Sequence, residues 1–360
     1  MPPHFDARAL IGGNLGQFQI KEELGRGGMA VVYKGYQPSL DRWVAIKTLP
    51  TEFTQDRELV SRFHREAEAM VTLNHTNIVR IIEKGEDRGL YYFAMEFVEG
   101  PSLKDLLKQE QMNMELVFEI SSQVADGLAY AHKKGIVHRD IKPANILWES
   151  STSLVKIADF GIARLTQKTE DQITLTSTNV GMGTMNYMAP EQKTDAAHVD
   201  ARADIYSLGV MIYEMFTGKL PMGRFKMPSE LNPSLPRKLD ELIGKCLETD
   251  PEDRYAGMEQ LKADLQLARE AAKGGVLVRS VRDAAERTLT AVKGGGGGLL
   301  LVGCVALFLV GGAGAAGAGW WYLKKRGGEV AVTPEGGKTT VTPPEKPPEK
   351  PPEKPPEKPP

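Results

Sequence analysis

The chain has 360 residues, of which 41% are hydrophobic and 26% are charged, so it carries enough apolar material for a globular core. Its formal net charge of −2 excludes the strongly basic footprint of a nucleic-acid-binding protein. Its two cysteines, Cys246 and Cys304, have no nearby cysteine or histidine, which argues against a disulfide framework or a zinc site. Residues 1–17 lack a basic segment followed by an apolar run, so no signal peptide is expected.

The first chemical motif is a glycine-rich run flanked by β-forming residues, which is typical of a hairpin. Glycines let backbone N–H groups approach phosphate oxygens, although an ordinary tight turn has the same composition. Ala30 stands where the pattern G-x-G-x-x-G has its third glycine, and a residue this small still allows the loop to cover a nucleotide. The run consists of Leu24, Gly25, Arg26, Gly27, Gly28, Met29, Ala30, Val31 and Val32.

Three apolar segments follow. Residues 44–47 are predicted to form a strand that ends in Lys47, a lysine that could equally extend to the surface. Residues 59–73 carry an apolar stripe at helical spacing, with Glu66 at its edge as one of several nearby acids. Residues 91–98 are predicted to form a buried strand that runs into a Glu-Gly-Pro breaker.

The densest group of functional side chains lies in the stretch His-Arg-Asp-Ile-Lys-Pro-Ala-Asn, residues 138–145. It is predicted to be a loop held between a helical run and a short apolar strand, a place where catalytic groups tend to occur. It supplies a carboxylate (Asp140), an ammonium (Lys142) and a carboxamide (Asn145). Such a set can orient a hydroxyl, neutralise a phosphate and ligate a hard divalent cation.

These motifs, in this order over residues 18–265, resemble those of the protein kinases. The residues in these motifs are similar to those of bacterial, eukaryotic-type (Hanks-type) serine/threonine kinases. The resemblance implies an α+β, bilobal protein-kinase fold with a β-rich N-lobe and an α-helical C-lobe. It also implies ATP as a ligand, Mg²⁺ as its metal with Mn²⁺ as an alternative, and proteins with Ser or Thr acceptors as substrates.

The resemblance assigns roles around the nucleotide. Lys47 binds the α- and β-phosphates and pairs with Glu66, and the glycine-rich run covers the phosphates. The strand of residues 91–98, running into the Glu-Gly-Pro breaker, is the hinge between the lobes, where the backbone of Glu96 and Val98 binds the adenine. Both lobes therefore contribute to one ATP site.

The resemblance also assigns the catalytic and metal-binding residues. Asp140 accepts the proton of the substrate hydroxyl, and Lys142 stabilises the transferring phosphoryl group. Asn145 and Asp159 hold the metal ion; Asp159 begins the sequence Asp-Phe-Gly, which without the resemblance is only a turn.

The segment between Asp159 and the Ala-Pro-Glu sequence at residues 189–191 is rich in hydroxyl groups. By composition it is a mobile polar loop; by resemblance it is the activation loop. Thr176 and Thr178 are the expected phosphorylation sites, with Arg139 and Arg164 as the basic pocket for the phosphate.

Two further contacts are implied in the C-lobe: Asp204 bonds the backbone of residues 138–145, and Arg254 pairs with Glu191. The segment between Gly218 and Leu239 is short and interrupted by prolines, which leaves little room for the usual substrate-docking helix.

The C-terminal part differs in composition. Residues 266–298 are predicted to be a basic juxtamembrane helix and a glycine-rich joint, with a solvated linker helix as the alternative. Residues 299–323 carry no charge, and a helix of about 25 residues is about 37 Å long, enough to cross a bilayer core of about 30 Å. Small residues spaced by four suit helix pairing there, which leaves room for a homodimer. Residues 324–360 are predicted to be an extended, disordered Pro/Glu/Lys-rich tail.

The predicted protein is thus a kinase anchored in the cell (inner) membrane by a single span and activated by autophosphorylation. Basic residues flank the span on both sides, so charge counting does not orient it. The need for ATP places the kinase domain in the cytoplasm and the tail outside. A pseudokinase scaffold and a kinase for small molecules are the alternatives.

Overall fold

The computed structural model describes residues 10–27, 30–49, 53–54, 56–109, 112–160, 184–194 and 199–274. The chain separates into two units, residues 1–282 and 283–360, and every described residue belongs to the first. Within the described ranges, no helix combines the length and apolarity needed to cross a membrane. The predicted span at residues 299–323 and the tail at 324–360 lie outside the described residues.

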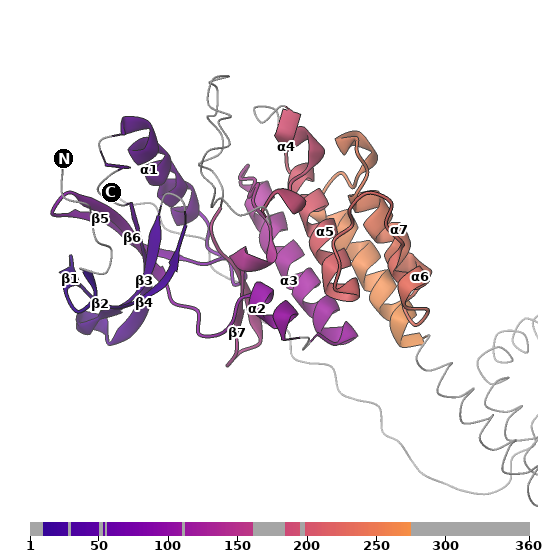
Figure 1. Ribbon diagram of the computed structural model, residues 1–360, viewed down its shortest axis with the longest axis horizontal. Coiled ribbons are helices and arrows are strands. Elements are labelled where there is room, and N and C mark those ends of the chain that lie inside the picture. Colours follow the sequence, from indigo (N-terminus) through magenta and orange to yellow (C-terminus); the bar gives the residue numbers. More distant parts are fainter. Residues whose placement is uncertain are drawn as a thin grey trace, which may run out of the picture. The chain divides into compact units, whose positions relative to one another are not determined.

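A six-stranded antiparallel sheet forms the amino-terminal part of this unit (Figure 1). Its order is β1-β2-β3-β4-β6-β5. The strands are β1 (Asn14–Leu15), β2 (Phe18–Arg26), β3 (Val31–Gln37), β4 (Arg42–Leu49), β5 (Ile81–Asp87) and β6 (Leu90–Glu96). The two ends of the glycine-rich run pair as β2 and β3, with Arg26 opposite Val31, as predicted for a hairpin, while residues 28 and 29 lie outside the described residues. Strand β3 places Val32 opposite Lys47 of β4.

Helix α1 (Arg57–Val71) lies against this sheet (Figure 1). Asp56 caps it by accepting hydrogen bonds from the backbone N–H groups of residues 58 and 59. The predicted apolar stripe is buried: Phe63, Ala67 and Met70 are each at most 5% exposed. Phe63 packs against Phe93 of β6 with ring centroids 4.9 Å apart, so α1 is anchored to the strand beside Lys47.

The carboxyl-terminal part is helical, with one small sheet (Figure 1). Its helices are α2 (Leu103–Lys108), α3 (Met114–Lys133), α4 (Pro190–Thr194), α5 (Arg202–Thr217), α6 (Pro228–Leu231), α7 (Arg237–Cys246) and a helix over residues 258–274. Helix α5 is apolar and buried and contacts both α3 and α7. Strands β7 (Ile146–Glu149) and β8 (Leu154–Ile157) form a hairpin next to the predicted catalytic loop.

Two findings connect this architecture with the sequence. One hydrophobic core runs from α1 through α3 and β8 to the helix over residues 258–274, so both lobes share buried side chains. The segment between α5 and α7 holds a single short helix, α6, which confirms the expected lack of room for a long docking helix.

Candidate active site

Residues 138–145 form a loop whose backbone is held by the buried carboxylate of Asp204 on α5. Asp204 accepts hydrogen bonds from the N–H groups of His138 (2.8 Å) and Arg139 (2.7 Å), which confirms the predicted contact. His132, at the end of α3, places its Nε2 2.8 Å from the same carboxylate. Burial by itself raises the pKa of Asp204, but the hydrogen bonds that its carboxylate accepts, first of all the one shared with His132, hold the pKa below its ordinary value. An ionised carboxylate therefore ties the loop to two helices.

His138 connects the loop with the segment that follows β8 and leads to Asp159. Its Nδ1 accepts a hydrogen bond from the N–H of Asp140 (3.2 Å), and its Nε2 lies 3.0 Å from the carbonyl oxygen of Ala158. Because Nδ1 is an acceptor, the ring proton is on Nε2 and is donated to Ala158. Burial lowers the pKa of His138, which keeps this neutral tautomer, and the ring packs on Phe160 at 4.5 Å.

The carboxylate of Asp140 is oriented by two neighbours in the same loop. The ammonium of Lys142 donates to its Oδ2 at 2.8 Å. The carboxamide of Asn145 donates to the same oxygen at 3.2 Å and to the Asp140 carbonyl at 2.8 Å. The structure thus brings together the three side chains that the sequence predicted as base, phosphoryl-stabilising cation and metal ligand.

Lys47 and Asp159 meet between the sheet and this loop. The Lys47 ammonium lies 3.1 Å from Oδ1 of Asp159 and 5.6 Å from the centroid of the Phe93 ring. The charge of Lys47 holds the pKa of Asp159 below its ordinary value. Glu66, the predicted partner of Lys47, is on α1, but its side chain is outside the described part of the chain, so that pairing stays a prediction.

Two site residues have an unusual backbone conformation. Arg139 has φ of 65° and Asp159 has φ of 55°, both in the left-handed region. This region costs a residue with a side chain about 1 kcal/mol or more. The hydrogen bonds of Asp204 and His138 on either side supply the restraint that maintains it.

The described oxygen atoms suit a hard cation. The carboxamide nitrogen of Asn145 faces Asp140, so its oxygen lies on the other side of the group. The N–H of Ala158 donates to the carbonyl of Asn145 at 2.9 Å, which places Asp159 directly beside it. One amide oxygen and one ionised carboxylate, completed by phosphate oxygens and water, match the way Mg²⁺ is bound in proteins. Asn145 and Asp159 therefore fit the metal role that the sequence predicted.

The predicted hinge follows β6. The N–H of Glu96 donates to the carbonyl oxygen of Arg80 at 3.0 Å, and the Glu96 carboxylate accepts from the Lys156 ammonium at 2.9 Å. Gly100 has φ of 152°, and a side chain there would collide with the carbonyl oxygen of Trp148, so this position requires glycine. The hinge geometry is set by these contacts, while the roles of Glu96 and Val98 toward adenine stay predictions.

The end of the predicted activation segment is anchored as expected. Arg254, whose side chain is fully buried, makes a two-point ion pair with Glu191 at 2.7 and 2.8 Å. Arg139 donates to the carbonyl of Val199 at 2.9 Å. Thr176, Thr178 and Arg164 lie outside the described residues, so the phosphorylation sites and their basic pocket stay predictions.

Sequence reasoning missed two residues that hold the loop. His132 lies 72 positions before its partner Asp204, and Gln192 donates to the carbonyl of Arg139, 53 positions earlier, at 2.9 Å. Neither residue stands in a motif. Only the packing of α3, α4 and α5 around the loop brings them to it.

Comparison with known proteins shows the family to which these residues belong. The family model described as protein kinase domain matches residues 18–265. A probable serine/threonine-protein kinase of Clostridium acetobutylicum is 40% identical over 264 residues, 69% of this chain and 39% of the relative. The serine/threonine-protein kinase PrkC of Bacillus subtilis is 37% identical over 275 residues, 72% of this chain and 42% of the relative. This chain thus spans about two fifths of these curated relatives.

A solved structure shows the same likeness. The crystal structure of the Mycobacterium tuberculosis PknI kinase domain is 29% identical in sequence and has a TM-score of 0.58. The match covers 71% of this chain and 98% of the PknI chain.

Proposed function

The chain belongs to the protein kinase domain family, and on this basis we propose that it is an enzyme that phosphorylates proteins on serine and threonine. We propose in addition, from the uncharged segment at residues 299–323, that it is anchored in a membrane. The observation that carries the first proposal is the Asp140 carboxylate, oriented by Lys142 and Asn145 next to the Lys47–Asp159 pair. A base, two ammonium groups and two metal ligands thus converge from both lobes. The bacterial relatives named as serine/threonine kinases support the acceptor type.

The chemistry is the transfer of the γ-phosphoryl group of ATP. Asp140 takes the proton of the acceptor hydroxyl as the oxygen bonds to the γ-phosphorus and the bond to the leaving ADP oxygen breaks. Lys47 orients the α- and β-phosphates, and Lys142 neutralises charge on the transferring group. A divalent cation held by Asn145 and Asp159 supplies further charge neutralisation at the phosphates.

Labelled ATP and the purified full-length chain, with a generic basic protein as acceptor, test this assignment. We expect phosphoserine and phosphothreonine in the product. The substitution Asp140→Asn should leave ATP binding nearly intact and reduce kcat by on the order of 10²–10⁴, the range for a positioned general base. A wild-type chain that binds ATP but transfers no phosphate would favour the scaffold alternative.

We further propose that autophosphorylation at Thr176, Thr178 or both activates the enzyme, because an added phosphate can order a loop against nearby arginines. Replacing both threonines with alanine should lower activity relative to the wild type. Equal activity of the two proteins, measured before any phosphatase treatment, would place the switch elsewhere.

The anchoring proposal rests on the uncharged segment at residues 299–323, with the kinase domain cytoplasmic and the tail outside. A tag after Pro360 should then be cut by protease added to intact cells, or to spheroplasts where an outer membrane intervenes. The kinase domain should survive this treatment. A tag that is protected until the membrane is opened would contradict the orientation.

A further inference from the structure

A lysine on strand β3, Lys34, lies on the same face of the sheet as Lys47. Side chains alternate between the two faces along a strand, and residues directly opposite each other on paired strands share a face. Val32 of β3 is opposite Lys47 of β4. Lys34 is two positions further along β3, opposite Ala45. Lys34 therefore projects from the side of the sheet on which Lys47 meets Asp159, the side proposed to hold the nucleotide.

The ammonium of Lys34 lies between two aromatic rings. It is 4.7 Å from the ring centroid of Trp43 on β4 and 4.7 Å from that of Phe97, the residue directly after β6. Both distances are within the range of about 6 Å in which an aromatic face attracts a cation. Tyr36 packs against the Trp43 ring with centroids 5.2 Å apart. We call Trp43, Lys34 and Phe97 the hinge cluster.

The charge of Lys34 is held mainly by these two rings. Its side chain is only 26% exposed. The one carboxylate within ion-pair distance among the described residues is that of Glu22, at 3.5 Å, and this side chain is 58% exposed. Water screens an ion pair with so exposed a partner, whereas a cation–π contact gains strength as the ammonium loses water.

The hinge cluster joins two parts of the molecule that backbone pairing leaves apart. In the sheet order, β4 lies between β3 and β6, so β3 shares no strand pairing with β6 or with the hinge that follows it (Figure 1). Two strand spacings amount to about 10 Å. The contact between Lys34 and Phe97 spans this separation through side chains alone.

Both ends of this contact are next to the expected adenine position. Phe97 stands between Glu96 and Val98, the two residues whose backbone is expected to bind adenine. At the other end, Lys34 is two positions from Val32, which shares the face of Lys47. A change in the distance between Lys34 and Phe97 therefore changes the opening that the adenine enters.

We propose that Lys34 is a positioning residue for ATP: clamped between Trp43 and Phe97, it sets the distance from β3 to the hinge. The inference rests on the proposed function, because it concerns the shape of that ATP site. Lys34 acts on nucleotide binding and leaves phosphoryl transfer unchanged, since Asp140 is oriented independently by Lys142.

Binding of a fluorescent ATP analogue to the full-length chain, with Mg²⁺ present, tests the proposal first. Lys34→Met keeps an apolar stem of similar length and removes the charge. We expect its Kd for the analogue to rise at least threefold. Lys34→Arg keeps a cation that stacks on aromatic rings, and its Kd should stay within twofold of the wild type.

The matched control is Lys21→Met, which removes an exposed lysine of β2 whose ammonium donates to Gln19. Its Kd should equal that of the wild type. Trp43→Leu removes one ring at a residue that is 47% exposed, and it should raise the Kd in the same direction as Lys34→Met. This variant carries the test if Lys34→Met does not fold.

Turnover is measured second, with a fixed protein acceptor. Lys34→Met should raise KM for ATP at least threefold and keep kcat within twofold of the wild type. A variant with lower kcat and unchanged KM would contradict the positioning role. Equal Kd and KM in an active wild type and in Lys34→Met would overturn the proposal.

The double variant Lys34→Met/Phe97→Leu decides whether Lys34 acts through the ring. If it does, the double variant should bind the analogue within twofold of Phe97→Leu alone, because the contact is already lost. Two single effects that multiply would mean that Lys34 acts on the nucleotide directly, and the proposal would be wrong. A wild type that binds the analogue but transfers no phosphate would refute the proposed function while the binding comparison stands. A wild type that binds no analogue would refute both.

Discussion

The catalytic loop and the outer face of α1 differ in how far their polar groups are paired with other described residues. In the loop, the N–H groups of His138 and Arg139 and the ring of His132 all meet the buried carboxylate of Asp204. On α1, two arginines lack carboxylate partners among the described residues, and a buried nitrogen of His64 has no hydrogen bond there. The difference indicates that the fold fixes the groups of the loop in advance, whereas the polar groups on the outer face of α1 have fewer partners among the described residues.

Removing the Asp204 side chain should have the largest effect, because it takes away the anchor of the catalytic loop. Asp204→Ala leaves two backbone N–H groups and His132 without their shared acceptor, which should cost about 3–5 kcal/mol of unfolding free energy. Activity should fall with it, because the loop loses its anchor. Denaturant unfolding of the full-length chain measures the effect. Asp204→Asn keeps one acceptor oxygen and should lose less; equal losses would contradict the anchoring role.

The Arg254–Glu191 pair provides a second buried contact in the same lobe. Arg254→Met should destabilise the protein by about 3 kcal/mol, because it leaves Glu191 without its cation. The double variant Glu191→Leu/Arg254→Met removes the stranded charge as well and should recover part of this loss. Thermal unfolding midpoints of the three proteins compare them. A double variant less stable than Arg254→Met would show that the charges themselves are not the cause.

The neutral ring of His138 predicts a smaller, pH-dependent effect. Burial lowers the pKa of His138 below the ordinary value of 6.5, so in the window just below pH 6.5 the unfolded chain binds the proton that the folded chain does not. Stability is therefore complete above pH 6.5 and decreases as the pH falls through it, by up to about 1.4 kcal/mol per pH unit.

The substitution His138→Gln removes the ionisable group at this position, so the stability of the variant should change less steeply with pH than that of the wild type between pH 6.5 and 5. His64 and His75, whose pKa values burial also lowers, are present in both proteins and cancel in the difference. Parallel stability curves would mean that His138 is not held neutral.

The smallest effect on stability is expected for substitutions on the outer face of α1. Arg57→Gln/Arg65→Gln removes two exposed cations that pair with no carboxylate of the described residues, so the unfolding free energy should change by less than about 0.5 kcal/mol. A large loss in the unfolding experiment would mean that these arginines support the fold.

Local patterns in the sequence determined several features correctly. The glycine-rich hairpin, the buried stripe of α1 and the loop at residues 138–145 follow from short-range spacing, because turn chemistry and helical periodicity act over a few residues. The sequence also showed that three side chains form one chemical set, namely Asp140, Lys142 and Asn145, because they lie within six positions of each other. Their family roles came from the resemblance.

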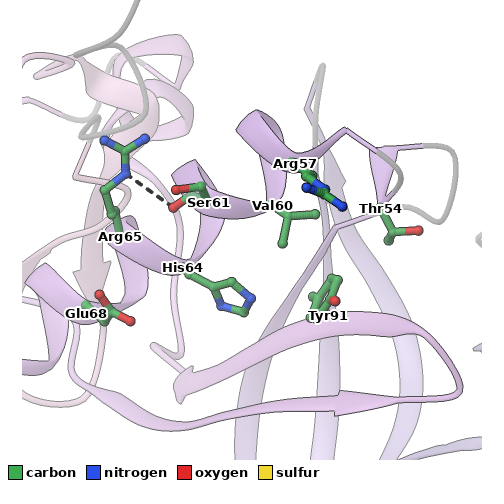
Figure 2. A pocket seen from close by; sticks show the side chains of 8 residues that line it. All are labelled: Thr54, Arg57, Val60, Ser61, His64, Arg65, Glu68 and Tyr91. Carbon is green, nitrogen blue, oxygen red and sulfur yellow. Dashed lines mark hydrogen bonds between the residues drawn. The ribbon is translucent and has the colours of Figure 1, made fainter.

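Only the tertiary structure decided how these groups are held. Arg139 and Asp159 have left-handed backbone angles that no pattern in the sequence predicts. The restraint comes from distant partners such as Asp204, which is 65 positions from Arg139. His132 and Gln192 join the loop through the packing of separate helices. The hollow lined by Arg57, His64 and Tyr91 arises in the same way, where the outer face of α1 meets a side chain of β6 (Figure 2). Sequence spacing carries information about neighbours along the chain, whereas these contacts depend on which surfaces the core brings together.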